Sequence, residues 1–286
     1  MAARTQRLIV AVALLCAPLA AQAPPARIIS LVPALTEILF AIGAGPQVIA
    51  VSSFDDDPPE VAKLPRVGAL LDPDTERILA MRPDLVLVYG SQVELEAQLK
   101  AAGIRTFAYR HGGLADLAPS FRAVGELTGR QDEARRLIDE IERRFAAVRS
   151  RVAGRGRPAV LLAMGHEPKS LRHLDASGGV GFLHDLIELA GGRNVLADIE
   201  RQAVRVSTEM LITRAPDVIV DLHYTREMGD AERREEQEVW RQAPSAPAVR
   251  NGRVHILLGD RFVVPGPRIA SAAEEYARAI HPEAFK

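Results

Sequence analysis

The chain contains almost no cysteine, and this scarcity excludes two kinds of chemistry. Its single cysteine, Cys16, lies within the first 23 residues, which have the features of a removable leader. Without them the chain has no thiol, so neither a disulfide nor a thiolate-bound metal can be invoked for it.

Neither sign of charge is in excess, and aromatic residues are scarce. Lysine and arginine number 36 against 37 aspartate and glutamate, so the chain lacks the basic surface of a nucleic-acid-binding protein. Nothing after the leader reaches the roughly 20 apolar residues of a membrane-spanning helix. Aromatics are only 5% of the residues, which limits the flat surfaces available to a ligand.

The first residues have the pattern of a secretory signal peptide. Arg4 and Arg7 precede an apolar run from Leu8 to Leu15, and small residues end at Ala21-Gln22-Ala23. We therefore predict a signal peptide over residues 1–23 and a periplasmic location. Lipid attachment at Cys16 is not expected, because bulky leucines stand before it where small residues are usual.

Residues 24–130 alternate short β-branched runs with short helical patterns. Such alternation is typical of parallel strands covered by helices, so we predict an α/β lobe. Strands are expected over 28–32, 48–52, 84–89 and 104–109, and helices over 36–42, 75–81 and 93–102.

A longer helix is predicted at residues 131–152, with apolar residues on one face and charged residues on the other. At 1.5 Å per residue it would extend about 33 Å, roughly the diameter of a small domain. It is either a surface helix packed on one core or a rigid connector between lobes. We assign 131–153 as a connector, because 154–286 again has strands (159–164, 217–222, 253–258) and helices (182–189, 208–214, 267–280) of an α/β lobe.

One segment of the first lobe is echoed in the second. Thr75-Glu76 and Thr208-Glu209 each begin a two-turn helical pattern, and Pro-Asp follows each glutamate by seven residues, just before an apolar strand. Good helix-start and turn chemistry could explain the echo locally. Alternatively, duplicated lobes present one glutamate each to a partner that carries two basic sockets.

The chain resembles the cobalamin-binding branch of the periplasmic substrate-binding proteins that serve ABC importers. The resemblance rests on Arg27 to Glu37 (RIISLVPALTE), on the twin glutamate segments and on Ala190 to Val195 (AGGRNV), and it covers essentially all of the chain after the leader. It implies two α/β lobes joined by one long backbone helix, the class III arrangement. It also implies a monomer that docks on the permease subunits through Glu76 and Glu209, with no enzymatic role.

The resemblance implies a ligand site between the lobes, with cobalamin or a related corrinoid as the leading ligand. Where aromatic residues wall the corrin in the family, this chain has Phe54, Leu70, Tyr89 and Ala203. In the closing loop Asp260 and Phe262 match the family pattern, whereas Arg261 and Val264 depart from it. The lost aromatics weaken the apolar contact to a flat macrocycle.

His166 follows the first strand of the second lobe, at the end where α/β proteins bind ligands. It is either an axial metal ligand or a solvent-exposed loop residue. With Tyr89 at the corresponding strand end of the first lobe, it keeps haem or a ferric chelate as the alternative ligand. No pair among the other histidines has the spacing of a protein-only zinc site.

A metal-dependent periplasmic enzyme is the remaining alternative. The chain has no nucleophile elbow, phosphate loop, dinucleotide fingerprint or zinc helix, and His166-Glu167 is the only adjacent acid and base pair expected in the cleft. The acidic run Asp55-Asp56-Asp57 lacks the spacing of a calcium loop, so we expect it to be a solvated loop.

Overall fold

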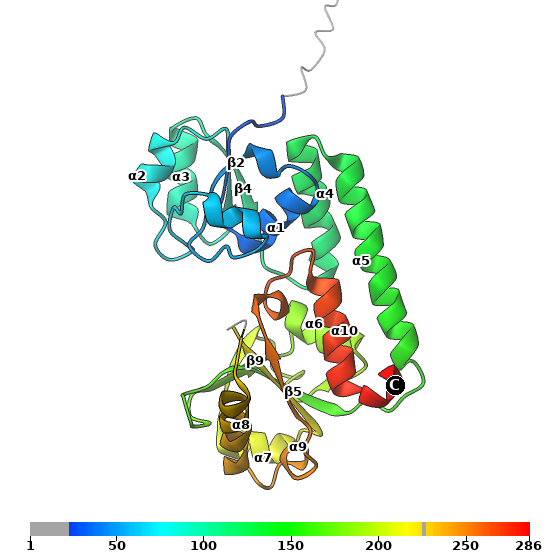
Figure 1. The fold of residues 1–286 in the computed structure, drawn as a ribbon. Helices are drawn as coiled ribbons and strands as arrows, with labels where there is room; N and C mark the ends of the chain where they lie inside the picture. The colour runs from blue at the N-terminus through cyan, green and yellow to red at the C-terminus, as the bar shows by residue number, and fades with distance from the viewer. Residues whose placement is uncertain (1–22, 225–226) are drawn as a thin grey trace, which may run out of the picture.

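The protein consists of two α/β lobes, one above the other, with a single long helix along one side (Figure 1). A computed structural model describes residues 23–224 and 227–286. Except for Ala23, the predicted signal peptide lies outside the described residues, as does Cys16. None of the described helices is long and apolar enough to cross a membrane.

The first lobe contains a four-stranded parallel sheet in the order β2-β1-β3-β4. Its central strands are almost wholly apolar and buried on both faces, as expected for a parallel sheet between helices. The strands are β1 (Ile28–Ser30), β2 (Val48–Val51), β3 (Leu85–Tyr89) and β4 (Arg105–Tyr109). The helices are α1 (Pro33–Ala41), α2 (Thr75–Ala80), α3 (Val93–Ala101) and α4 (Leu117–Thr128), the last of which the sequence analysis did not predict.

The second lobe contains a mixed sheet in the order β10-β9-β5-β6-β8, with β7 beside β5. Strand β6 runs antiparallel to both of its neighbours, and the sequence analysis predicted neither β6 nor β8. The strands are β5 (Ala159–Gly165), β6 (Leu174–Ser177), β7 (Arg193–Asn194), β8 (Ala203–Val206), β9 (Val218–His223) and β10 (Val254–Leu258). The helices are α6 (Phe182–Leu189), α7 (Thr208–Arg214), α8 (Asp230–Val239), α9 (Pro247–Arg250) and α10 (Ile269–Ile280).

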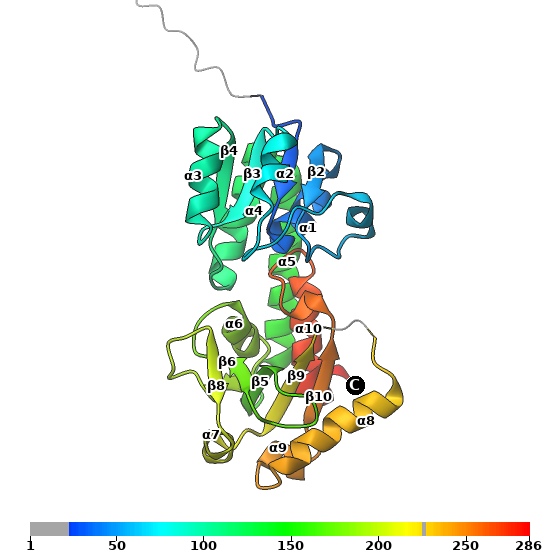
Figure 2. The same cartoon turned by 90° about the vertical axis from the view of Figure 1, so that its left-hand side faces the viewer.

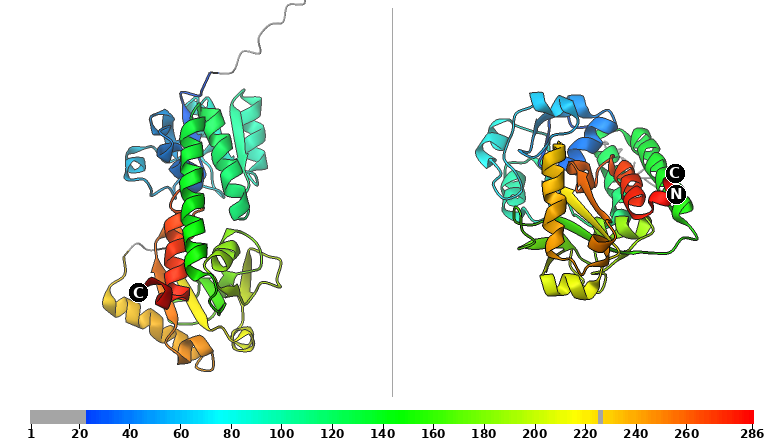
Figure 3. Two further views of the ribbon diagram at one scale, coloured as in Figure 1. Left: turned by 90° about the vertical axis from the view of Figure 1, so that its right-hand side faces the viewer. Right: turned by 60° about the horizontal axis from the view of Figure 1, so that its bottom comes forward.

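Helix α5 (Gln131–Val152) has the predicted limits and runs along both lobes, with α10 beside its C-terminal half (Figure 3). Its buried face carries apolar residues at helical spacing, among them Ile138, Ile141 and Phe145. Arg144 ties it to α10, donating to Glu274 and to Ser271 at 2.9 Å each. The connector thus packs on the second lobe as well as joining it to the first.

The sheet of the second lobe separates two apolar cores. Alternate residues of β5 and β9, such as Leu162 and Val220, face the core shared with α6 and α10. The intervening residues, such as Leu161 and Ile219, face a second core that contains Trp240 at the end of α8. Side chains at the ends of these two strands are therefore divided between the two layers.

Candidate functional site

The lobes meet along the carboxyl ends of their parallel strands. From the segment after β4, Gly112 accepts a hydrogen bond from the Phe182 amide at 3.1 Å. The His111 ring lies edge-on to the Phe182 ring, 4.9 Å between centroids. Figure 2 shows the same edges turned toward each other. This is the edge at which open α/β sheets bind ligands.

A cavity of about 210 Å³ lies where the lobes meet. The first lobe contributes His111, and most of the lining comes from apolar residues of the second lobe. Tyr224, which follows β9, is 62% exposed and is one of them. His111 and Tyr224 were not among the predicted ligand residues, although the strand-end rule that selected His166 also applies to the ends of β4 and β9.

Two of the predicted ligand residues lie at strand ends of the first lobe. Phe54, after β2, is 72% exposed, the kind of exposed apolar surface that marks a binding site when it is part of a patch. Tyr89 ends β3 and packs edge-on to Tyr109, with ring centroids 6.2 Å apart. Burial raises the pKa of Tyr89 to about 12, so its hydroxyl stays protonated at neutral pH.

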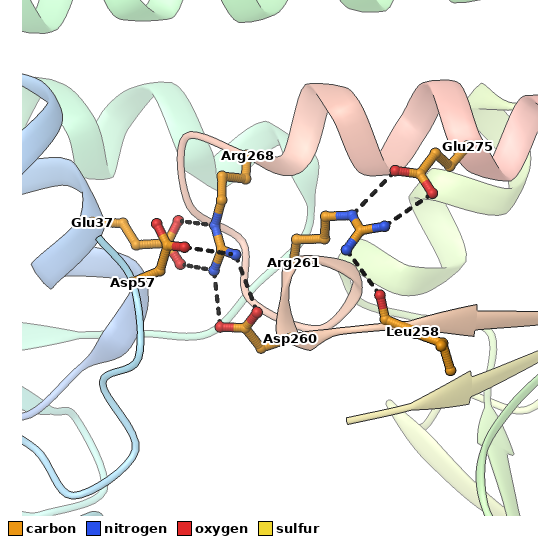
Figure 4. A network of polar contacts seen from close by, with 7 residues as sticks. All are labelled: Glu37, Asp57, Leu258, Asp260, Arg261, Arg268 and Glu275. Carbon is orange, nitrogen blue, oxygen red and sulfur yellow. Dashed lines mark hydrogen bonds and ion pairs between the residues drawn. The ribbon is translucent and has the colours of Figure 1, made fainter. Parts of the chain in front are cut away.

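Asp260, also assigned to the ligand, is part of an ion-pair network that joins the lobes (Figure 4). Arg268, just before α10, contacts both Asp260 oxygens at 3.1 and 2.9 Å. It also binds both oxygens of Glu37 on α1, one of them at 3.0 Å. A third carboxylate, that of Asp57 in the first lobe, lies 3.3 Å from Arg268 Nη1, and Asp55 is fully buried. The expectation that the acidic run Asp55-Asp56-Asp57 is a solvated loop is therefore wrong for two of its three residues.

One guanidinium in this network faces three carboxyl groups. Glu37 is 5% exposed, and burial raises its pKa to about 7 against the opposing hydrogen bond from Arg268. The negative charges of Asp57 and Asp260 raise it further. Hydrogen bonds to Glu37 and Asp260 raise the pKa of Arg268 although burial opposes its charge. Protonation of Glu37 therefore relieves an excess of negative charge.

Replacing Glu37 with glutamine should change how stability depends on pH. Burial raises the folded-state pKa of Glu37 from its ordinary 4.5 to about 7, so the stability that Glu37 contributes is present below pH 4.5 and lost as pH rises through 7. Between pH 5 and 8 the unfolding free energy of Glu37→Gln should gain up to about 3 kcal/mol relative to the parent chain. Urea titrations at several pH values measure this difference.

The matched control is Glu274→Gln, which removes a carboxylate paired with Arg144 but 38% exposed. Its stability profile should run parallel to that of the parent chain. A Glu37→Gln profile that also runs parallel would contradict a raised pKa at Glu37.

Phe262, the next predicted ligand residue, is fully buried. Its ring packs on Tyr276, with centroids 5.6 Å apart, and the Arg261 guanidinium lies 4.4 Å from its centroid. Arg261 also pairs with Glu275 inside the second lobe, through two contacts of 3.1 Å. Phe262 therefore packs inside the second lobe and supports the loop that carries Asp260.

His166 lies beneath α8, in the layer that contains Trp240. Its side chain is 4% exposed, and its Nε2 is 3.5 Å from an Asp221 oxygen and 3.7 Å from a Glu236 oxygen. His223 Nε2 is 3.3 Å from the same Asp221 oxygen. The Asp221 carboxylate raises the pKa of both imidazoles, that of His166 to about 9. This grouping was not predicted from the sequence, although Asp221 and His223 are two residues apart on β9 and therefore share one face of the strand.

The two predicted docking glutamates are exposed in the first turn of α2 and α7. Asp74 and Ser207 cap the helices, each accepting a hydrogen bond from a backbone amide. Within residues 23–224 and 227–286, neither glutamate has a hydrogen bond or ion pair. Other residues therefore cap these two helices, and the carboxylates of Glu76 and Glu209 take no part in capping.

The Pro-Asp pairs of the two echoed segments have equivalent positions. Asp84 accepts hydrogen bonds from two amides just before β1, at 2.8 and 2.9 Å. Asp217 accepts one from Ala159 at the start of β5, at 2.9 Å. Asp84 thus holds the start of β3 beside β1, and Asp217 holds the start of β9 beside β5. The repeated Pro-Asp pair therefore has a structural cause.

Comparison with known proteins gives likenesses that extend over nearly the whole chain. The family model described as periplasmic binding protein matches residues 28–260. A vitamin B12-binding protein of Salmonella typhimurium is 30% identical over 256 residues, 89% of this chain and 90% of the relative.

Two solved structures have a similar fold. The periplasmic vitamin B12 binding protein BtuF of Vibrio cholerae has a TM-score of 0.78 and 25% identity, over 92% of this chain and 99% of that one. The periplasmic heme-binding protein RhuT from Roseiflexus sp. RS-1, in apo form, has a TM-score of 0.75 and 27% identity, over 90% and 98%. Both likenesses include the two lobes and the helix between them.

Proposed function

The chain belongs to the periplasmic binding protein family, and from this premise we propose that it binds a corrinoid, cobalamin or a close relative, between its lobes and delivers it to an ABC importer. The proposal places the protein in the periplasm as a monomer. Residues 24–130 and 154–286 are its two ligand-binding lobes, and 131–153 is the connector.

The observation that carries the proposal is the meeting of two strand-end edges that bear exposed apolar side chains. Phe54 and Leu71 of the first lobe are 72% and 94% exposed, and Val180 and Tyr224 of the second are 40% and 62% exposed. Val180 and Tyr224 both line the cavity between the lobes. A large ligand with an apolar face would cover this surface, and relatives of similar length are named for vitamin B12.

In this proposal Phe54, Tyr89 and Tyr224 contact the ligand, and Phe262 supports the loop that carries Asp260. Both oxygens of Asp260 already accept hydrogen bonds from Arg268, so Asp260 contacts the ligand while it keeps this ion pair. His166 is not proposed as an axial ligand of the bound molecule, because its Nε2 is directed at Asp221 and Glu236 beneath α8.

Titration of the mature protein with cyanocobalamin, followed by visible absorption and calorimetry, tests the proposal. We expect saturable binding of one molecule per chain, weakened about 10-fold by Phe54→Ala and by Tyr224→Ala because each removes an aromatic face. Ile212→Ala is the matched control, since Ile212 is 43% exposed but lies on α7, and its affinity should be unchanged. No saturable binding would reject a corrinoid, and conversion of the ligand would support an enzyme instead.

Haem is the second candidate, and His111 with Tyr224 is the observation that favours it. Both side chains line the cavity between the lobes, and imidazole and phenolate are axial ligands of haem iron. Burial lowers the pKa of His111, which keeps its ring neutral and able to bind a metal. A Soret shift with haemin that His111→Ala abolishes, together with no response to cyanocobalamin, would select haem.

We further propose that Glu76 and Glu209 dock on the two permease subunits of the importer. Each is an exposed, unpaired carboxylate in the described structure, and each lobe supplies one. Their common position in the first turn of an echoed helix gives the protein two similar contacts for two similar membrane subunits.

A further inference from the structure

Four side chains with metal-ligand chemistry converge beneath α8, outside the cleft between the lobes. His166 Nε2 lies 3.5 Å from Asp221 Oδ2 and 3.7 Å from Glu236 Oε2. His223 Nε2 lies 3.3 Å from Asp221 Oδ2, and ligand atoms of the two histidines and Asp221 all lie within 4.8 Å of one another. The residues come from the end of β5, from β9 and from α8.

The polar atoms at the centre of this cluster are buried without hydrogen-bond partners in the described structure. They are His166 Nε2, His223 Nε2, Glu236 Oε2 and Asp221 Oδ1. The side chains of His166 and Asp221 are 4% and 0% exposed. Leaving such atoms unsatisfied costs about 1–3 kcal/mol each, so an ion that binds both histidine Nε2 atoms and Glu236 Oε2, with Asp221 Oδ2 beside them, is favoured.

The groups around the cluster orient it as a ligand set. His166 Nδ1 is 2.9 Å from the Glu167 carbonyl oxygen, so Nδ1 donates its proton there and Nε2 is the ring nitrogen that faces the cluster; a bound ion would displace the proton that Asp221 favours on Nε2. The Trp240 indole donates to Asp221 Oδ2 at 2.9 Å. Hydrogen bonds of these two kinds typically hold metal-binding histidines and carboxylates in place.

We propose that His166, Asp221, His223 and Glu236 form a binding site for one divalent first-row transition ion, with Zn²⁺ as the reference ion. Ligands about 2.05 Å from a tetrahedral zinc lie roughly 3.3 Å from one another. The three separations of 3.3, 3.5 and 3.7 Å are close to that value. Two imidazoles and two carboxylates suit zinc or a neighbouring divalent ion better than calcium or copper(I).

The bound ion would fasten α8 to the sheet. Of the ten residues of α8 only Val239 is buried, so apolar packing alone holds the helix weakly. Glu236 comes from α8, whereas the other three ligands belong to the sheet and its edge. Metal binding would therefore hold α8 against the core that contains Trp240, and it would do so independently of the ligand in the cleft.

The experiment uses chelator-treated mature protein titrated with Zn²⁺ by calorimetry and with Co²⁺ by visible absorption. We expect one ion per chain and intense Co²⁺ bands of tetrahedral type. The variant His166→Ala/His223→Ala should bind Zn²⁺ at least about 100-fold more weakly. His173→Ala is the matched control, because His173 belongs to the same lobe and its side chain is 61% exposed, and it should bind as the parent chain does.

A second measurement needs no variant and so does not depend on the fold of a mutant. Amide exchange of residues 230–239 in the parent chain should slow when Zn²⁺ is added, because the ion ties Glu236 to the sheet. The site would be rejected if the parent chain bound no Zn²⁺ saturably, if the double variant bound it equally well, or if α8 exchange were unaffected. None of these results depends on a cleft ligand, so failure here is distinct from failure of the proposed transport role.

Discussion

Reversing both exposed glutamates, Glu76→Lys with Glu209→Lys, is expected to abolish ligand uptake through the importer while leaving ligand affinity unchanged. Each substitution would place a lysine opposite a basic socket of the permease, and like charges brought together at an interface cost several kcal/mol. Uptake should fall at least about 100-fold. Transport of labelled cobalamin into proteoliposomes that contain the importer measures the effect, and calorimetry of the free protein measures ligand affinity.

The matched control reverses two other first-turn glutamates, Glu94 on α3 and Glu232 on α8, one in each lobe. Both are exposed, and reversal costs each helix a similar favourable interaction with its dipole, about 0.3–1 kcal/mol. The control should therefore lose comparable stability but keep transporting. Full uptake by the Glu76/Glu209 variant, or an equal loss in the control, would reject paired docking and leave only the local explanation for the echo.

The features that follow from local periodicity were predictable from the sequence. Helix α5 keeps its apolar residues at helical spacing over 22 residues, so its limits could be read without tertiary information. The helix predicted over 182–189 begins at Phe182, directly after a glycine with φ 93. Strands β6 and β8 were missed, because they are four residues long and each contains polar residues where a buried strand would be continuous.

The features that depend on contacts between distant segments were not predictable. Glu37 and Arg268 are separated by 231 positions, and nothing local to either residue indicates the other. Their contact also needs Gly266, where a β-carbon would lie 2.6 Å from a Glu37 oxygen. The cluster around Asp221 similarly requires the register of β5 against β9 and the placement of α8. His166 was identified correctly as a strand-end residue, but the face to which it turns is a property of the folded sheet.

Replacing Arg268 with alanine should be among the most destabilising single substitutions in the protein. It would leave Glu37 buried and ionisable beside Asp57 and Asp260, without the guanidinium that pairs with all three. Removing one partner of a buried ion pair typically costs about 3–5 kcal/mol, which urea unfolding at pH 8 would measure. The loss should shrink toward pH 5, because protonation of Glu37, whose pKa is raised to about 7, removes one unpaired charge.

Arg261→Ala is the control that separates the inter-lobe network from arginine packing in general. Arg261 also holds a carboxylate through two hydrogen bonds, but its partner, Glu275, is in the same lobe and the pair is partly exposed. That variant should lose about 1 kcal/mol or less, with little dependence on pH. Equal losses in both variants at every pH would mean that Arg268 acts through local packing alone. A larger, pH-dependent loss for Arg268→Ala would identify the charge network as a contact that holds the two lobes together.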